Sequence, residues 1–345
     1  IYKTKSNTLK LLFVYNSSPM PEARLKTLFA WRSLAKEVQV LFAYPKNYKR
    51  TTLDRVLHKI KIPIDANNLN KSIKESCISF KPDIVFIVKG VTVKPSTLKF
   101  IKARGIKSIS WSNDDMFAWH NRSYWYSKGL KYYDLVVTQK SYNCDSHELP
   151  SLGAKTYFQN KAFEPTIHKP VDDCKAFDCV HAVVFIGAKE QDRLEHLLYL
   201  AEHGIQVHIY GWVVKEPNPL HDNIIIHDRF LYEDEFCTAQ GCSKIALNFL
   251  RKMNRDLQTS RSIEIPAVRG FMLAERTDEH MQLFKEGKEA EFFSSKEELL
   301  EKVNYYLQHD QERLAIAKAG YERCFKDSYT FENRMQGILN NLFDV

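Results

Sequence analysis

The sequence predicts an α/β protein made of two doubly wound domains, each a parallel sheet with helices on both faces. Short apolar runs alternate with amphipathic stretches along most of the chain, as in repeated βαβ units. The alternation pauses over residues 163–177, a charged segment with two prolines, and resumes at Ala182. The 345 residues suit about two domains. We expect domains at 1–165 and 166–328 with a cleft between them, and a helix at 329–345 that returns to the first domain.

Five apolar runs in the first half predict strands, because parallel strands covered on both faces are almost continuously apolar. These runs are Lys10–Tyr15, Val38–Tyr44, Asp83–Val88, Lys107–Trp111 and Asp134–Thr138. The amphipathic stretches between them have helical spacing. They predict helices at Ala23–Leu34, Asn67–Phe80 and Pro95–Arg104.

The second half repeats the same pattern with six apolar runs. They predict strands at Ala182–Ile186, Gln206–Tyr210, Asn223–Ile226, Lys244–Phe249, Phe271–Ala274 and Ala290–Phe293. Helices are expected at Gln191–His203, Lys296–His309, Gln311–Phe325 and Tyr329–Leu342.

Charge is divided unequally between the two halves. Residues 1–170 contain 29 Lys and Arg against 12 Asp and Glu, a balance of +17, whereas residues 171–345 contain 21 against 30, a balance of −9. A basic half suits an anionic partner, although a solvated lysine-rich surface is an equally good interpretation. The lysine-rich segments form no known nucleic-acid motif.

Cysteine usage and hydropathy suggest a cytoplasmic protein. The seven cysteines are scattered and form no C-x-x-C motif, so we expect reduced thiols. No run of 18 apolar residues is present, so no transmembrane helix is expected. Peripheral attachment to the inner face of a membrane remains an alternative.

The most informative segment is Arg251–Glu264, which follows the apolar run Ile245–Leu250. It predicts a strand, a polar loop with Asn254 and Asp256, and a short helix capped near Thr259 that carries Arg261 and Glu264. The strand–loop–helix junction of an open α/β sheet is a common site for phosphorylated ligands. Two carboxylates eight residues apart can each accept paired hydroxyl hydrogen bonds, which suggests a nucleotide-sugar site.

Two further strand ends carry glycines. Gly187 follows the strand ending at Ile186, with Lys189 and Arg193 close behind as candidates for neutralising a diphosphate. Gly211 stands at the corresponding position one unit later. A lone glycine after a strand is more often only a tight turn, so each signal by itself is weak.

The segment His227–Tyr232 follows another predicted strand. At the carboxyl edge of a sheet, the backbone near Phe230 and Leu231 is placed to hold a nucleobase. An ordinary connecting loop is an equally good interpretation.

The segment Trp111–His120 follows a predicted strand in the basic half. Asp114, Asp115 and His120 are candidate general bases, because Asp and His are the groups used near neutral pH. The alternative is structural: the carboxylates cap a helix and the histidine belongs to the core.

The segment from Arg261 to Leu307, which begins RSIEIPAVRG, closely resembles the carboxyl-terminal domain of CgeB-type (spore-maturation-type) glycosyltransferases of the GT-B superfamily. The pieces FIGAKEQDR, IYGW and SWSNDD followed by YYDLVVT are also similar to that family. The resemblance implies a GT-B fold and a nucleotide-sugar donor. It also implies that Glu264 holds the ribose and Asp256 takes the place of a second glutamate, that Lys189, Arg193 and Arg261 serve the diphosphate, and that Gly270 lets the chain turn close to the donor.

We therefore expect a glycosyltransferase in which the second domain binds the donor and the first binds an acceptor. The acceptor class suggested by the charge is an anionic glycan, a polymer, a lipid head group or a nucleic acid. Asp256, Asp114, Asp115 and His120 are the catalytic candidates, with a retaining mechanism favoured weakly. Donor contacts are expected from Gly187, Lys189, Arg193, Gly211, Phe230, Leu231, Arg251, Asn254, Thr259, Arg261 and Glu264. No cofactor and no metal cluster are expected. A catalytically silent sugar-nucleotide-binding module and a nucleic-acid-modifying or nucleic-acid-binding protein are the alternatives.

Overall fold

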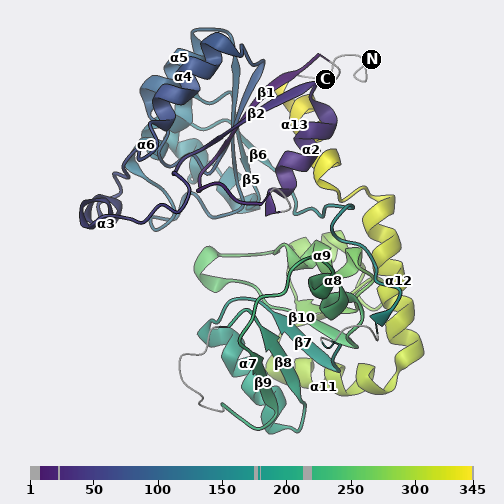
Figure 1. Ribbon diagram of the computed structural model, residues 1–345. Helices are drawn as coiled ribbons and strands as arrows, with labels where there is room; N and C mark the ends of the chain where they lie inside the picture. Colours follow the sequence, from purple (N-terminus) through teal and green to yellow (C-terminus); the bar gives the residue numbers. More distant parts are fainter. Residues whose placement is uncertain (1–7, 22–23, 175–177, 179, 213–219, 344–345) are drawn as a thin grey trace. The chain divides into compact units, whose positions relative to one another are not determined.

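The computed structural model describes residues 8–343 except 22–23, 175–177, 179 and 213–219 (Figure 1). It contains two compact units, one formed by residues up to 160 together with those from 331 on, the other by residues 161–330. Each unit has its own six-stranded sheet, and every strand pairing in both sheets is parallel. The predicted class, two doubly wound α/β domains, is confirmed.

The first sheet has the strand order β2-β1-β3-β4-β5-β6. Its strands are β1 Lys10–Tyr15, β2 Glu37–Phe42, β3 Ile84–Val88, β4 Lys107–Ser112, β5 Leu135–Thr138 and β6 Thr156–Phe158. Five of them lie where the apolar runs predict strands. The sixth, β6, was not predicted, because it is a three-residue edge strand without a buried residue.

Helices of the first unit connect these strands in βαβ order. They are α2 Lys26–Leu34, α3 Thr52–Lys59, α4 Leu69–Ser79, α5 Pro95–Lys102 and α6 Tyr124–Gly129, joined by α13 Phe331–Leu342 from the end of the chain. Helix α13 packs against α2. The Gln159 side chain donates a hydrogen bond to the Arg334 carbonyl oxygen at 2.8 Å. These contacts attach the last helix to the first unit.

The second sheet has the strand order β12-β11-β10-β7-β8-β9. Its strands are β7 Val183–Ile186, β8 Val207–Tyr210, β9 Ile224–His227, β10 Ile245–Asn248, β11 Met272–Glu275 and β12 Glu291–Phe293. Its helices are α7 Gln191–Glu202, α8 Glu233–Gly241, α9 Arg261–Ala267, α10 Asp278–Leu283, α11 Lys296–Gln308 and α12 Asp310–Lys326. Each predicted strand is present within two residues of its predicted ends.

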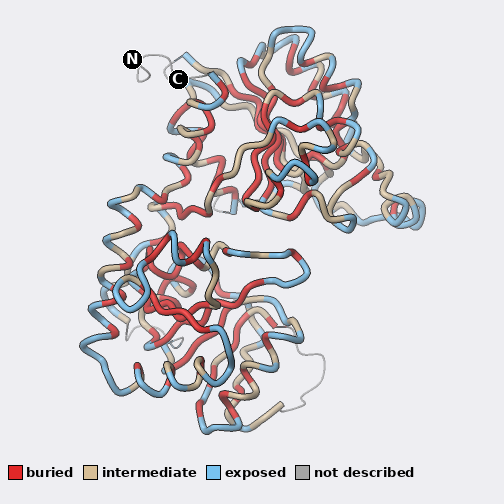
Figure 2. Tube along the Cα trace, turned by 180° about the vertical axis from the view of Figure 1, so that it is seen from behind, coloured by how far each residue is buried: buried red, intermediate tan, exposed pale blue. Residues whose placement is uncertain are grey.

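Alternate residues of the central strands enter two separate cores, which is why these strands are apolar throughout. Val184 in β7 packs in a cluster with Phe236 of α8 and Ile263 of α9. Its neighbour Phe185 points to the other face and packs in a cluster with Leu197 of α7. Figure 2 shows the result as strands buried along their length, with exposed residues on the surrounding helices and loops.

Strand order locates the ligand edge of each sheet. The chain winds outward in opposite directions from β7 and β10 in the second unit, and from β1 and β3 in the first. The loops beyond the carboxyl ends of such a strand pair diverge and leave a crevice, where open α/β sheets bind their ligands. The functional residues are therefore sought after β7 and β10, and after β1 and β3.

The expectation of reduced thiols throughout is wrong for one pair. Cys174 and Cys242 form a disulfide, with Cα atoms 5.7 Å apart. The two residues are 68 positions apart in sequence, and only the fold brings them together. Cys77, Cys144, Cys237 and Cys324 are not in disulfides. Among the described residues, no helix has the length and apolar character needed to cross a membrane.

Candidate functional site

The candidate donor site lies at the carboxyl edge of the second sheet, beyond β7 and β10. Residues 187–190 lead from β7 into α7, and residues 249–260 lead from β10 into α9. Strands β7 and β10 are hydrogen-bonded neighbours, so both loops begin at the same place. The fold thus gathers most of the predicted donor residues, which the sequence places up to 77 positions apart, at one edge.

Two of the predicted glycines lie side by side at this edge. Gly211 has φ +89°, a left-handed conformation that side chains disfavour, and a Cβ atom there would lie 3.2 Å from the Gly187 carbonyl oxygen. The Gly187 N–H donates to the Tyr210 carbonyl at 3.1 Å. Glycine at 211 therefore permits close packing of the two strand ends.

Gly270 serves a different purpose from the one that the family resemblance implies. It precedes β11 and therefore lies at the amino end of that strand, away from the ligand edge. A Cβ atom at this position would lie 2.3 Å from the Gln240 carbonyl oxygen. Its lack of a side chain makes room for the end of α8, and the expectation that it faces the donor is wrong.

Arg193 holds the two loops together. Its guanidinium donates to the Ala188 carbonyl at 2.8 Å on the β7 side, and to the Leu250 and Phe249 carbonyls at 3.3 and 3.4 Å on the β10 side. The residue is buried, and desolvation lowers its pKa. A buried guanidinium bonded to three carbonyls fixes the shape of the crevice.

The loop after β10 is braced by polar pairs. Arg251 Nε lies 2.8 Å from Glu190 Oε1, which ties this loop to the one after β7. Asn254 is buried and its amide donates to Asp256 Oδ1 at 2.8 Å. Arg255 between them has φ 47°. Asp256 is thus held in a turn at the ligand edge, with its orientation set by Asn254.

Thr259 belongs to a buried network below the crevice. Its hydroxyl donates to Asn248 Oδ1 at 2.9 Å, and its N–H donates to Ser262 Oγ at 2.9 Å. Ser262 Oγ also lies 2.6 Å from His280 Nε2. Burial lowers the pKa of His280 to about 4, so this ring is neutral and acts as a hydrogen-bonding partner inside the core. The network anchors the start of α9 to β10.

Glu264 and Arg261 form an ion pair on one face of α9. The Glu264 carboxylate is only 2% exposed, and its Oε1 atom lies 3.4 Å from His168 Nε2. Arg261 also donates to the Ile186 carbonyl at 3.3 Å, and its guanidinium lies 4.4 Å from the Phe236 ring centroid. Arg261 therefore connects α9 to the end of β7 while part of its side chain stays exposed.

Three other predicted donor residues lie around this edge. Lys189 is exposed, with its ammonium 5.6 Å from the Trp212 ring centroid. Phe230 is 55% exposed, whereas Leu231 is buried. An exposed aromatic ring beyond the end of β9 offers a flat apolar face to solvent.

The predicted acidic pair in the first unit separates into two roles. Asp115 is fully buried and its Oδ1 accepts from the Phe117 and Ala118 N–H groups and the Asn143 amide, at 3.0–3.1 Å. Asp115 therefore has a structural role, but it caps a turn and not the predicted helix, because residues 116–121 form bends and turns. Asp114 lies 2.5 Å from the ammonium of Lys89 and is partly exposed. Since Lys89 follows β3 and Asp114 follows β4, this pair stands at the ligand edge.

Beside that pair lies a small basic pocket of about 180 Å³. No carboxylate is among its lining residues in the described part of the chain. Its lining includes six basic or imidazole side chains: Arg50, His58, Lys61, Lys89, His120 and Arg122. Burial and then the charges of Arg50 and Lys61 lower the pKa of His58, whereas Asp54 opposes this shift. The predicted candidate His120 is therefore part of a cationic pocket at the switch point of the first sheet.

A larger cavity, about 790 Å³, lies elsewhere in the first unit. It is lined by residues that precede β1, β3 and β4, such as Leu9 and Asp83, and by Leu339 of α13. These positions are at the amino edge of the sheet, opposite the edge at which doubly wound folds bind ligands. Its size is therefore no reason to place the functional site there.

Sequence reasoning missed several residues of these two edges. His168 and Glu190 contact predicted residues, and the Glu275 carboxylate at the end of β11 accepts from the Leu250 N–H. In the first unit it missed Lys89 and Arg122. Lys89-Gly90 after a strong apolar run was a usable signal, whereas the pairing of His168 with Glu264, 96 positions away, leaves no local trace.

Comparison with known proteins shows which families and solved structures this chain resembles. Residues 191–340 match the model of a family described as glycosyl transferase-like. No curated protein matches the sequence. HepE of Anabaena, solved in complex with UDP, has a TM-score of 0.64 at 11% identity over 98% of this chain and 100% of HepE. A glycosyltransferase from Rickettsia africae has a TM-score of 0.65 at 14% identity, covering 98% and 99% of the two chains.

A UDP-GlcNAc 2-epimerase from Neisseria meningitidis, bound to UDP-GlcNAc, has a TM-score of 0.53 at 14% identity over 98% of this chain and 100% of its own. At these identities the structural likeness shows the fold, which is GT-B, and the fold alone does not separate transfer from epimerisation. The family match of the second half favours transfer. Together they confirm the GT-B fold and support the prediction of a glycosyltransferase, while the CgeB-type subfamily stays a prediction.

Proposed function

We propose that this GT-B glycosyltransferase moves a sugar from a nucleotide-sugar donor, held at the β7/β10 edge of the second unit, to an anionic acceptor held at the β1/β3 edge of the first. The observation that carries the proposal is the convergence of predicted donor residues on one switch point. Relatives in fold that were solved with UDP or UDP-GlcNAc make uridine nucleotides the first donors to test.

The diphosphate is assigned to Lys189 and Arg261. Lys189 is exposed directly after β7, and Arg261 begins α9 with part of its side chain open to solvent. Arg193 was an equal candidate from the sequence, but its bonds to carbonyls of both loops suit it to shaping the crevice. Cations placed where the diphosphate departs stabilise the transition state electrostatically.

Glu264 is proposed to accept the ribose hydroxyls. Its oxygens contact Arg261 and His168, yet a carboxylate has about four lone-pair sites and can accept further hydrogen bonds beside them. The Glu264 side chain is 2% exposed, so little of it is open to a ligand. The same ion pair orients Arg261, so a single carboxylate would couple ribose and diphosphate recognition.

Asp256 is proposed to orient the donor sugar, with Asn254 fixing its carboxylate. A retaining reaction needs no protein base, because a phosphate oxygen of the departing diphosphate takes the acceptor proton. An inverting reaction needs one, and Asp114 and His120 are better placed for it than Asp115, whose carboxylate caps backbone N–H groups.

The acceptor proposal rests on the basic pocket. Four basic side chains, Arg50, Lys61, Lys89 and Arg122, line a volume that suits a phosphate or carboxylate group. The pocket contains four of the basic side chains that contribute to the +17 balance of the first half. A nucleic acid stays among the anionic acceptors, whereas a silent binding module predicts donor binding without turnover.

A panel of nucleotide sugars tests the proposal. Thermal unfolding is measured with each donor and with the matching nucleotide diphosphate, since a ligand at 100 times its Kd adds about 2.7 kcal/mol. Donors that stabilise the protein are then incubated with candidate phosphorylated and acidic acceptors, and release of nucleotide diphosphate is followed. Stabilisation with acceptor-dependent release supports the proposal. Stabilisation without any release supports the silent module, and no stabilisation by any donor contradicts the assignment.

A further inference from the structure

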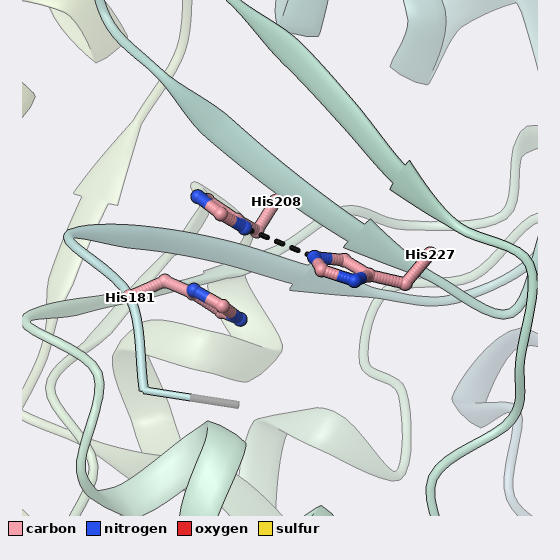
Figure 3. A group of neighbouring side chains, drawn as sticks. All are labelled: His181, His208 and His227. Atoms are coloured by element: carbon pink, nitrogen blue, oxygen red, sulfur yellow. Dashed lines mark hydrogen bonds between the residues drawn. The ribbon is translucent and has the colours of Figure 1, made fainter. Parts of the chain in front are cut away.

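Three histidines meet on one face of the second sheet (Figure 3). His181 precedes β7, His208 lies in β8 and His227 ends β9. Tyr210 of β8 pairs with His227 of β9. His208 is two residues before Tyr210, so the side chains of His208, Tyr210 and His227 lie on the same face of the sheet. One ring nitrogen of each histidine lies within 4.8 Å of the others.

We propose that His181, His208 and His227 form a binding site for a divalent transition metal of the zinc class. Imidazole nitrogen is a preferred ligand of zinc, copper and nickel, and three histidines with water in the fourth position is an established zinc coordination set. The residues are separated by 27 and 19 positions in the sequence, so no metal motif is visible there. The expectation that the chain has no metal cluster overlooked this group for that reason.

One of the three nitrogen pairs already has a spacing close to that of a metal site. His208 Nδ1 and His227 Nε2 are 3.0 Å apart and share a hydrogen bond (Figure 3). Two nitrogens bound to a tetrahedral zinc at ~2.0–2.1 Å lie roughly 3.3–3.4 Å apart, so a metal replaces this proton with a shift of a few tenths of an ångström. The His181 ring stacks on His208 with centroids 3.6 Å apart, and it must turn out of the stack to complete the set.

Neighbouring groups already orient two of the rings. His208 Nε2 lies 3.1 Å from Gln206 Oε1, so the Nε2–H donates and the Nδ1 lone pair faces His227. The Tyr210 hydroxyl lies 2.7 Å from His181 Nε2. Hydrogen bonds of this kind fix the tautomer and the direction of metal-binding histidines.

Burial and nearby charged groups both act on the three rings. Burial and then the neighbouring imidazoles lower the pKa of His181 and of His208 to about 4. Burial and then Arg229 lower the pKa of His227, and Asp178 opposes the shift. Asp178 also pairs with Arg229 at 3.0 Å, which reduces the repulsion between that guanidinium and an incoming cation.

The test uses the full chain without an affinity tag, stripped with EDTA and desalted. Zn²⁺ is titrated by calorimetry, and Co²⁺ by its visible absorption, whose intensity reports tetrahedral coordination. We expect one equivalent to bind. Each of His181→Gln, His208→Gln and His227→Gln should weaken Zn²⁺ binding ~10-fold or more, since even loss of an outer-shell partner costs 10–100-fold. His203→Gln, at an exposed histidine directly after the end of α7, is the matched control and should leave the affinity unchanged.

A second measurement avoids the variants and any effect they have on folding. In the Co²⁺ form of the natural sequence, proton NMR should show shifted imidazole N–H resonances from three histidines. Two or fewer such resonances would overturn the three-histidine site. So would stoichiometric binding that survives all three substitutions in folded protein, or the absence of Zn²⁺ binding at millimolar concentration. The inference does not depend on the proposed transfer activity.

Discussion

At the scale of single residues, the second unit depends on buried polar groups that act in pairs. Glu264 is the clearest case, because a buried carboxylate is costly unless a cation and hydrogen bonds accompany it. Arg261 and His168 supply them. The sequence marked Glu264 and Arg261 through their place at a strand–loop–helix junction, with Glu264 eight residues after Asp256. His168 became visible only in the fold.

The first prediction is that Glu264→Gln lowers nucleotide diphosphate affinity by one to two decades. A hydrogen bond to a charged group contributes about 1.5–3 kcal/mol, and the amide loses that charge while keeping the shape. Calorimetry with the nucleotide that stabilises the protein measures the change. Glu291→Gln, a buried carboxylate of β12 that pairs with Lys302, is the control. Equal affinity for natural protein and Glu264→Gln would remove the ribose assignment.

A second residue-scale prediction concerns acid. The pKa of His280 is about 4 because of burial, against about 6.5 in an unfolded chain. Between these values the unfolded chain binds a proton that the folded chain does not, so stability is full above pH 6.5 and falls as pH drops towards 4. The loss from this group is about 3 kcal/mol. Urea unfolding at pH 7 and pH 5 should show a smaller pH effect in His280→Gln than in the natural protein. The exposed His309→Gln should behave like the natural protein, and identical slopes in all three proteins would contradict the account.

At the scale of elements, apolar runs were sufficient to locate the central strands, because strands such as Ile84–Val88 are buried at every position. Elements with mixed exposure were missed. Strand β6 is a short edge strand, and α8 begins with three acidic residues and has only weak apolar periodicity. Strand order lies outside what a local pattern encodes, so the switch points that define the site required the structure.

The third prediction treats Arg193 as a clamp between two loops. Arg193→Lys should lower the free energy of unfolding of the second unit by about 2–3 kcal/mol, because lysine cannot reach three carbonyls at once. Donor affinity should fall as well, since the crevice loses its fixed shape. Denaturant unfolding followed by nucleotide calorimetry measures both effects. Arg251→Lys, in a more exposed pair with Glu190, is expected to change stability by no more than about 0.5 kcal/mol. An Arg193→Lys variant with the stability and donor affinity of the natural protein would show that the bonds of Arg193 to the two loops are unimportant.

At the scale of the whole molecule, the unequal charge of the two halves should separate the responses to salt. The acceptor Michaelis constant should rise steeply between low and high salt, because screening shortens the Debye length to ~3 Å at 1 M. The donor constant should move little. Replacing Lys61 and Arg122 together by Gln should reduce the salt effect on the acceptor, whereas the matched pair Lys99 and Lys102 on α5 should not. Equal salt responses for both substrates would show that the unequal charge of the two halves has no role in acceptor binding.

A further whole-molecule prediction concerns metal and catalysis. Transfer should persist in excess EDTA, because Lys189 and Arg261 are assigned to the diphosphate in place of a divalent ion. Activity assays with and without chelator measure this. Loss of transfer that manganese restores would contradict the proposed mechanism.

The central claim is that a nucleotide sugar binds at the carboxyl edge of the second sheet, between the loops that follow β7 and β10. Hydrogen exchange followed by mass spectrometry, with and without the donor that most stabilises the protein, locates that site directly. The account predicts protection in residues 187–193 and 250–264, with a weaker effect at 228–232, and none at the β1/β3 edge until an acceptor is added. Protection confined to the first unit, or no protection at a donor concentration that raises the unfolding temperature, would contradict it.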